Sequence, residues 1–173
     1  MKINFVDLKR QYISIKKEVD SAIADVLDKT SYIMGENVIK FQEEFAMFCG
    51  VKYAIGVNSG SAALQLSLIA AGIKPGDEII TTPFTFIATA EAISNVGAKP
   101  VFVDINKDTY NIDAAKIKDS VTGKTKAILP VHLYGQCADM GPILEIAKKY
   151  KLIVIEDACQ AHGAEYKGRK AGS

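Results

Sequence analysis

The chain has 173 residues, about the length of one domain, and its composition of 49% hydrophobic and 24% charged residues is typical of a globular protein. Lys and Arg (21) almost balance Asp and Glu (20), so the net charge of +1 gives no electrostatic footprint for nucleic acid or an anionic membrane surface. No stretch approaches the roughly 20 apolar residues of a membrane span, and residues 1–7 hold no sustained apolar run. We therefore expect a cytoplasmic protein that binds neither nucleic acid nor a membrane.

The first 50 residues are predicted to form a helical segment. Apolar side chains recur at three- and four-residue steps over 8–28, which predicts an amphipathic helix. A second helix is expected over about 37–48, and Gly50 is the predicted stop at its C-terminal end.

From residue 51 onward, short apolar runs alternate with helical patterns. This alternation predicts a largely parallel α/β sheet covered by helices on both faces. The expected strands are 53–57, 78–82, 100–104, 126–131 and 152–156. The expected helices are 60–71, 85–96, 112–120 and 139–150. Only a polar tail follows the last strand, so the sequence predicts that the domain of residues 51–173 is incomplete at its C-terminal end.

Cysteines and histidines give little indication of a metal site. Cys49, Cys137 and Cys159 are odd in number and far apart, which favours free thiols in a reducing compartment. Neither His132 nor His162 has a partner at metal-ligand spacing, so no metal is expected. His132 follows a predicted strand and could instead face a pocket.

Residues 58–64, Asn-Ser-Gly-Ser-Ala-Ala-Leu, join a predicted strand to a predicted helix. Glycine allows close approach of a ligand, and free N–H groups at a helix start suit a phosphate. The alternative is an ordinary serine cap without a ligand. The segment matches neither a P-loop nor G-x-G-x-x-G, which disfavours a nicotinamide-binding domain.

Two other strand ends carry chemically useful side chains. Phe84 and Phe86 follow the strand at 78–82, and either could stack on a planar ring or pack in the core. Asp157 and Gln160 follow the strand at 152–156, at the edge where open α/β sheets bind ligands. A carboxylate facing a pyridine nitrogen would keep it protonated and make the ring an electron sink, although Asp157 could also be a simple helix cap with Glu156 solvated.

Taken together and in order, four motifs are recognisable. They are residues 58–64, Phe-Thr-Phe-Ile-Ala-Thr at 84–89, Pro-Val-His-Leu-Tyr-Gly-Gln at 130–136 and Val-Ile-Glu-Asp-Ala-Cys-Gln-Ala at 154–161. The chain resembles the DegT/DnrJ/EryC1/StrS family of sugar aminotransferases that depend on pyridoxal 5'-phosphate (PLP). The resemblance also covers Phe-Val-Asp-Leu-Lys-Arg-Gln-Tyr at 5–12 and Ile-Met-Gly-Glu at 33–36.

The resemblance implies the large domain of PLP fold type I, the aspartate-aminotransferase-like fold. It implies that Gly60, Ser61 and Ala62 bind the cofactor phosphate and that Phe86, with Phe84 as second choice, stacks on the ring. It also implies that Asp157 pairs with the pyridinium nitrogen and that Gln160 lies near the phenolic oxygen.

The resemblance places the catalytic Schiff-base lysine, and the small domain, beyond Ser173. Lys167 and Lys170 lie in a polar tail that offers no desolvated setting for such a lysine. The implied activity of the full-length parent is transfer of an amino group, usually from L-glutamate, to a keto group of a nucleotide-linked sugar, as in cell-surface polysaccharide biosynthesis. Segments 109–113 and 133–139 suggest a UDP-linked 3-keto-glucuronate. The family also implies a homodimer.

Two alternatives remain open. One is a sugar dehydratase of the same fold, in which histidine replaces the lysine. The other is a non-catalytic truncated domain, and the chain alone is predicted to be inactive.

Overall fold

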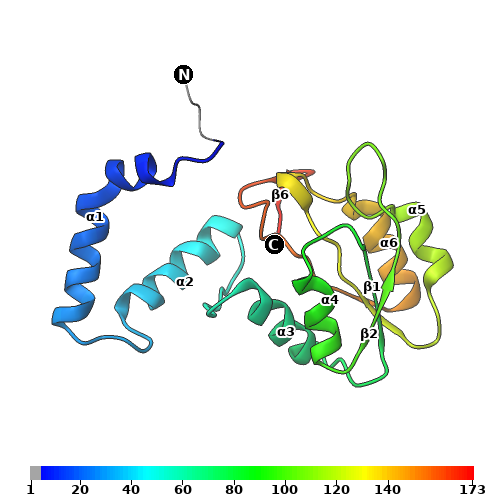
Figure 1. Cartoon of the computed structure of the whole chain (residues 1–173). Coiled ribbons are helices and arrows are strands. Elements are labelled where there is room, and N and C mark those ends of the chain that lie inside the picture. Colours follow the sequence, from blue (N-terminus) through cyan, green and yellow to red (C-terminus); the bar gives the residue numbers. More distant parts are fainter. Residues whose placement is uncertain (1–4) are drawn as a thin grey trace.

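The computed structural model describes residues 5–173, whereas residues 1–4, the start of the predicted helical segment, lie outside the described part. Three helices come first in the chain, α1 (Leu8–Asp28), α2 (Glu36–Cys49) and α3 (Gly60–Ala70). No side chain of α1 is buried, and α1 lies apart from the sheet (Figure 1). The predicted bounds of this helix are confirmed, and most of its apolar stripe is exposed in the described structure, with Val19 and Val26 partly buried.

A four-stranded parallel sheet forms the centre of the remaining chain. Its spatial order is β2 (Lys99–Phe102), β1 (Glu78–Thr81), β3 (Thr125–Ile128) and β4 (Ile153–Val154). Every neighbouring pair in this sheet is parallel, as predicted. The connecting helices are α4 (Ala88–Asn95), α5 (Ala114–Ile117) and α6 (Met140–Tyr150), with 3-10 turns at Lys118–Ser120 and Leu133–Gly135.

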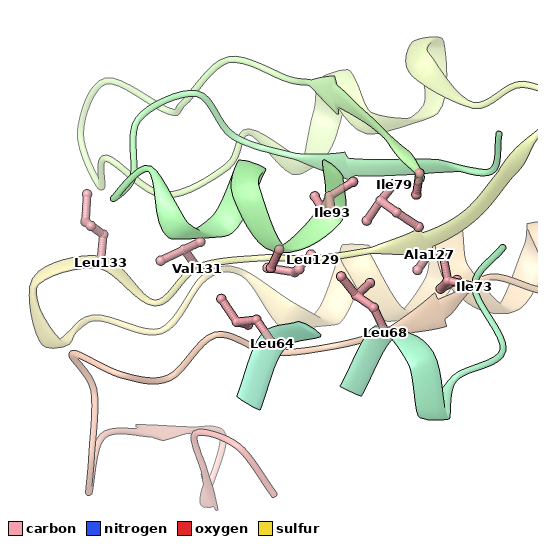
Figure 2. Packing of buried hydrophobic residues seen from close by; sticks show 11 residues of the cluster. Leu64, Leu68, Ile73, Ile79, Ile93, Ala127, Leu129, Val131 and Leu133 are labelled. Atoms are coloured by element: carbon pink, nitrogen blue, oxygen red, sulfur yellow. The ribbon is translucent and has the colours of Figure 1, made fainter. Parts of the chain in front are cut away.

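Alternation along the strands divides the core into two layers. Ile79 packs with α3 and α4 on one face, and the next residue, Ile80, packs with α5 and α6 on the other. Successive side chains of a strand point to opposite faces, so a strand covered on both sides is apolar throughout. Figure 2 shows the first layer, in which α3 and α4 lie over the sheet through Leu64, Leu68, Ile93, Ile79, Ala127 and Leu129.

The predicted strand at 53–57 is wrong. This segment has no strand neighbour in the described residues, and Tyr53 and Ile55 are 72% and 82% exposed. Within this segment the backbone N–H of Gly56 donates a hydrogen bond to the side chain of Gln42, at 2.8 Å from its Oε1, and not to a neighbouring strand. A run of alternating apolar residues becomes a strand only when another strand takes up its backbone hydrogen bonds.

The other predicted elements are confirmed with shifted ends, and the sequence missed the 3-10 turn at Leu133–Gly135 and a C-terminal hairpin. Helix α2 ends at Gly50 in a left-handed conformation (φ 71°), as predicted from the glycine. The tail expected to be only polar contains an antiparallel hairpin of β5 (Glu165–Tyr166) and β6 (Arg169–Lys170). Its two turn residues, Lys167 and Gly168, both have positive φ (51° and 79°), the backbone of a tight hairpin turn.

None of the helices within residues 5–173 combines the length and the apolar character needed to cross a bilayer.

Candidate functional site

The structure brings five of the six predicted site residues to one cavity of about 300 Å³. The cavity lies where β1, β3 and β4 end and α3 begins. Its lining includes Gly60, Ser61, Phe86, Asp157 and Gln160. Phe86 follows β1, Asp157 and Gln160 follow β4, and Gly60 and Ser61 begin α3, so two strand ends and one helix start meet at one edge of the sheet.

The first turn of α3 forms one wall. Ser59 caps the helix, and its Oγ accepts the backbone N–H of Ala62 at 3.1 Å. Ala62, the sixth predicted residue, does not line the cavity, and its N–H is occupied by this cap. The amides of Gly60 and Ser61 are the first two of the helix and have no intrahelical acceptor, so they could donate hydrogen bonds to a ligand in the cavity.

Asp157 also lines the cavity and is held by its backbone. Its N–H donates to Pro130 O at 2.9 Å, and its carbonyl accepts from His132 N at 2.9 Å. Its Oδ1 accepts the N–H of Cys159 at 3.2 Å, and the residue is 9% exposed. The sheet ladder therefore continues one step past β4 and places a buried carboxylate in the cavity wall.

The structure distinguishes the two candidate aromatics. Phe86 lines both this cavity and a neighbouring cavity of about 330 Å³, whereas Phe84 lines the neighbouring cavity but not this one. Phe84 lies 5.9 Å from the ring of Tyr110 and 6.5 Å from that of Tyr134. Gln160 borders both cavities, and its Oε1 accepts the N–H of Tyr134 at 2.8 Å, which fixes the direction of the amide group.

Polar side chains outside the predicted site residues also line the cavity. Thr85 and Thr89, from the segment whose threonines could meet polar groups of a ligand, share a hydroxyl hydrogen bond of 3.1 Å. Cys159, which the sequence did not single out for this site, lies beside Gly60. A Cβ on residue 60 would come within 3.1 Å of Cys159 Sγ, so a glycine suits this position. The sequence signal that could have identified Cys159 was its position two residues after Asp157, because a loop that follows a strand end can turn back toward the same edge of the sheet.

No lysine of the described residues lines this cavity. Lys167 lies over the ring of Tyr166, 5.0 Å from its centroid, and a hydrogen bond to that hydroxyl raises the pKa of Lys167. Lys170 pairs with Glu165 at 3.2 Å. A nucleophilic lysine needs a lowered pKa, which the raised pKa of Lys167 opposes. Lys170 is occupied by its carboxylate partner outside the cavity.

Neither histidine lines the cavity, and both make contacts elsewhere in the fold. His132 is fully buried and its ring contacts Glu156, which corrects the view of Glu156 as simply solvated. The ring of His162 packs edge-on against Phe45 at 5.8 Å. Residues 5–173 contain no group of three or more His, Cys, Asp or Glu side chains arranged to hold a metal ion.

Comparison with known proteins identifies the family. The model of the DegT/DnrJ/EryC1/StrS aminotransferase family matches residues 13–173. The chain belongs to this family. It is 49% identical, over 172 residues, to a pleiotropic regulatory protein of Geobacillus stearothermophilus, covering 99% of this chain and 46% of that protein. It is 48% identical to the UDP-2-acetamido-2-deoxy-3-oxo-D-glucuronate aminotransferase of Pseudomonas aeruginosa, with coverages of 98% and 47%. The chain thus spans about half the length of these curated relatives.

Solved structures of similar proteins share the fold. Streptomyces venezuelae DesV, crystallised with a ketimine intermediate, superposes with a TM-score of 0.97 at 45% identity over 99% of this chain and 46% of DesV. NtdA of Bacillus subtilis, with the cofactor PMP bound, gives 0.93 at 37% identity over 98% of this chain and 39% of NtdA. A GDP-4-keto-6-deoxymannose-3-dehydratase superposes with a TM-score of 0.83 at 37% identity, over 88% of this chain and 41% of the dehydratase chain. The predicted α/β fold of PLP type I, with its parallel sheet, is confirmed, and these neighbours imply PLP as the family's cofactor.

The thiol of Cys159, which lines this cavity, has a raised pKa. Burial, followed by the charge of Asp157 and a hydrogen bond to it, raises the pKa of the Cys159 thiol to about 11. The thiolate is the reactive form, so at pH 8 its fraction falls roughly 100-fold below that of a thiol with pKa 9. We expect iodoacetamide to label Cys159 about 100-fold more slowly than it labels glutathione, as measured by peptide mass spectrometry over time. Cys159→Ser identifies the peptide, and labelling at the glutathione rate would contradict the prediction.

Proposed function

We propose that this chain carries the cofactor site of a PLP-dependent enzyme that moves an amino group from an amino acid, L-glutamate in the first instance, to a keto group of a nucleotide-linked sugar. The observation that supports it is the single cavity bordered by the start of α3, the ring of Phe86 and the buried carboxylate of Asp157. The activity is proposed for the whole protein, because the matched relatives are about twice as long as the chain.

The residues present fit the chemical groups of the cofactor. Donors at a helix start suit its phosphate, and Gly60 and Ser61 supply them. The aromatic side chain of Phe86 gives a face for a planar ring. When bound, PLP supplies an electron sink for the bonds at the donor carbon. The buried carboxylate of Asp157 would hold a proton on the pyridine nitrogen, and the fixed amide of Gln160 would lie near the phenolic oxygen.

The lysine that carries the cofactor is proposed to come from residues other than 1–173. This proposal is supported by the absence of any lysine from the cavity lining within the described chain. We further propose that residues 1–50 are an N-terminal helical segment and that 51–173 are part of the large domain. A cytoplasmic homodimer that takes part in cell-surface polysaccharide biosynthesis agrees with the family.

The amino acceptor is proposed to be a UDP-linked 3-keto sugar acid. The Pseudomonas aeruginosa relative, an aminotransferase of a UDP-linked 3-oxo-glucuronate, supports this choice. A GDP-perosamine synthase of Caulobacter vibrioides and a dTDP-sugar transaminase of Streptomyces venezuelae are similar to the chain at 52% and 45% identity, so assays with GDP- and dTDP-linked keto sugars are the comparison that tests the nucleotide.

A dehydratase is the second candidate. The same part of the fold occurs in a GDP-4-keto-6-deoxymannose-3-dehydratase at 37% identity. The two activities would both use Asp157 and the amides of Gly60 and Ser61. They would differ in the residue beside the aldehyde group of the cofactor, a lysine in the aminotransferase and a histidine in the dehydratase. A chain that only binds a partner is the third candidate.

The deciding experiment starts from the intact protein purified from its source. It is treated with PLP and borohydride and weighed by mass spectrometry, then assayed with L-glutamate and a UDP-linked 3-keto sugar. One pyridoxyl group on one lysine and formation of an amino sugar are expected. Loss of water from the sugar without nitrogen transfer would favour the dehydratase, and no adduct with no turnover would overturn the enzymatic proposal.

A further inference from the structure

Glu156 and Asp157 are consecutive residues on extended backbone, so their side chains point to opposite sides of the strand end. Asp157 lines the cavity of the proposed cofactor site. Glu156 lines a smaller cavity of about 140 Å³ on the other side, together with Cys137, Tyr166 and Arg169. What holds Glu156 therefore also sets the direction in which Asp157 points.

One carboxylate oxygen of Glu156 accepts two hydrogen bonds. His132 Nε2 donates to Oε2 at 2.7 Å, and the backbone N–H of Gly172 donates to the same atom at 3.0 Å. Burial raises the pKa of Glu156, but the hydrogen bonds from His132 and Gly172 outweigh it and leave this pKa below its ordinary value. The group is thus an ionised acceptor, partly shielded from solvent, with 21% of its side chain exposed.

The His132 ring has its protonation pattern set by its neighbours. Nδ1 lies 3.0 Å from the backbone N–H of Ala138, and a backbone amide can only donate. The proton of the imidazole is therefore on Nε2, where it points at Glu156. Both ring nitrogens are satisfied in a side chain with no exposure to solvent, so the ring has a single orientation.

His132 forms hydrogen bonds to both Glu156 and Asp157. Its backbone N–H donates to Asp157 O at 2.9 Å, while its ring donates to the side chain of Glu156. The two hydrogen bonds close a small ring of covalent and hydrogen bonds around the peptide that joins residues 156 and 157. A change in the backbone torsions of residues 156 and 157 that turned the Asp157 carboxylate away would move Cα156 relative to Cα157, and it could not keep both hydrogen bonds to His132.

We propose that His132 and Glu156 are positioning residues that fix the carboxylate of Asp157 toward the ring nitrogen of the cofactor. This inference rests on the proposed function, since it assigns to the pair a role in the same site. The pair acts through Asp157 and does not itself line the cavity beside Phe86.

The test uses the intact protein and pyridoxamine phosphate, a probe that binds without a lysine. Its Kd is measured by titration, and the pyridine nitrogen, labelled with 15N, reports its own protonation by NMR. Glu156→Ala removes the acceptor and is expected to weaken Kd by roughly 10- to 100-fold, as loss of outer partners does at metal sites. The 15N signal should move toward the unprotonated position. Glu156→Gln keeps an oxygen acceptor for His132 and should retain a Kd within about threefold of wild type.

A matched control separates positioning from general stability. Ile143→Val in α6 trims a fully buried side chain of the second core layer and should lower the melting temperature without moving Kd or the 15N signal. Should Glu156→Ala fail to fold, Glu156→Asp draws the carboxylate back by one methylene and should shift both readouts in the same direction.

The outcomes are distinguishable. A wild-type protein that binds no pyridoxamine phosphate would overturn the proposed function and this inference with it. Wild-type binding with an unchanged Kd and 15N signal in Glu156→Ala or Glu156→Asp would overturn the positioning role alone. Equal shifts in Ile143→Val would also overturn that role, because they would reflect loss of stability only.

Discussion

Asp157→Asn is expected to lower the kcat of the intact protein by roughly a hundred- to a few-thousand-fold. Asparagine keeps an oxygen to accept the Cys159 N–H but carries no charge. Removal of one partner from a buried ion pair costs about 3–5 kcal/mol, and each 1.4 kcal/mol or so is a factor of ten in rate. The neutral side chain can no longer hold a proton on the pyridine nitrogen. The measurement is a single-turnover reaction with L-glutamate, followed by absorbance.

Asp104→Asn is the matched control for this change. Asp104 is another acidic residue just past a strand, β2, but its side chain is 73% exposed and lies 3.8 Å from Lys116. Its loss should leave kcat within about twofold of wild type, because exposed ion pairs contribute little. A rate for Asp157→Asn as high as that of the control would rule out an essential carboxylate at residue 157.

Ile128→Ala is expected to lower the free energy of unfolding by about 2–5 kcal/mol, because it leaves a cavity in a closely packed core. Ile128 is fully buried in β3, which lies between β1 and β4, and it packs in the layer covered by α6. Urea denaturation of the intact protein should give a lower midpoint at an unchanged slope.

Lys126→Ala, two residues earlier in the same strand, provides the comparison. Its side chain is exposed, and we expect a change within about 0.5 kcal/mol. If the two variants lost the same stability, the burial assigned to β3 would be incorrect.

Prediction from the sequence succeeded where the signal was local. The three- and four-residue steps over 8–28 located α1 to the residue, and Gly50 marked the end of α2. It failed at 53–57, because the same alternation is compatible with an exposed, unpaired segment and only a neighbouring strand decides between the two. The hairpin of β5 and β6 was missed because its strands have two residues each, too short to show a period.

The candidate site followed the same rule. Residues placed directly at strand ends, such as Asp157, could be predicted to meet because parallel strands end at one edge. The pairing of His132 with Glu156 spans 24 positions in sequence and depends on the register between the neighbouring strand ends of β3 and β4. No spacing pattern encodes such a contact, so the sequence left both side chains without an assigned partner.

The sheet order also bears on how the chain reaches its native state. Strand β1 sits between β2 and β3, and the bond from Thr81 Oγ1 to Leu129 O joins residues 48 positions apart. Each such contact requires closure of a long loop before it contributes stability, and topologies rich in distant contacts fold in milliseconds to seconds, roughly, whereas helical bundles need microseconds to milliseconds. Helices such as α1 and α2 form within their own segments, so they can be complete before the sheet. The docking of β3 between β1 and β4 is therefore the expected slow step of folding, and the cavity at the strand ends exists only once that step is finished.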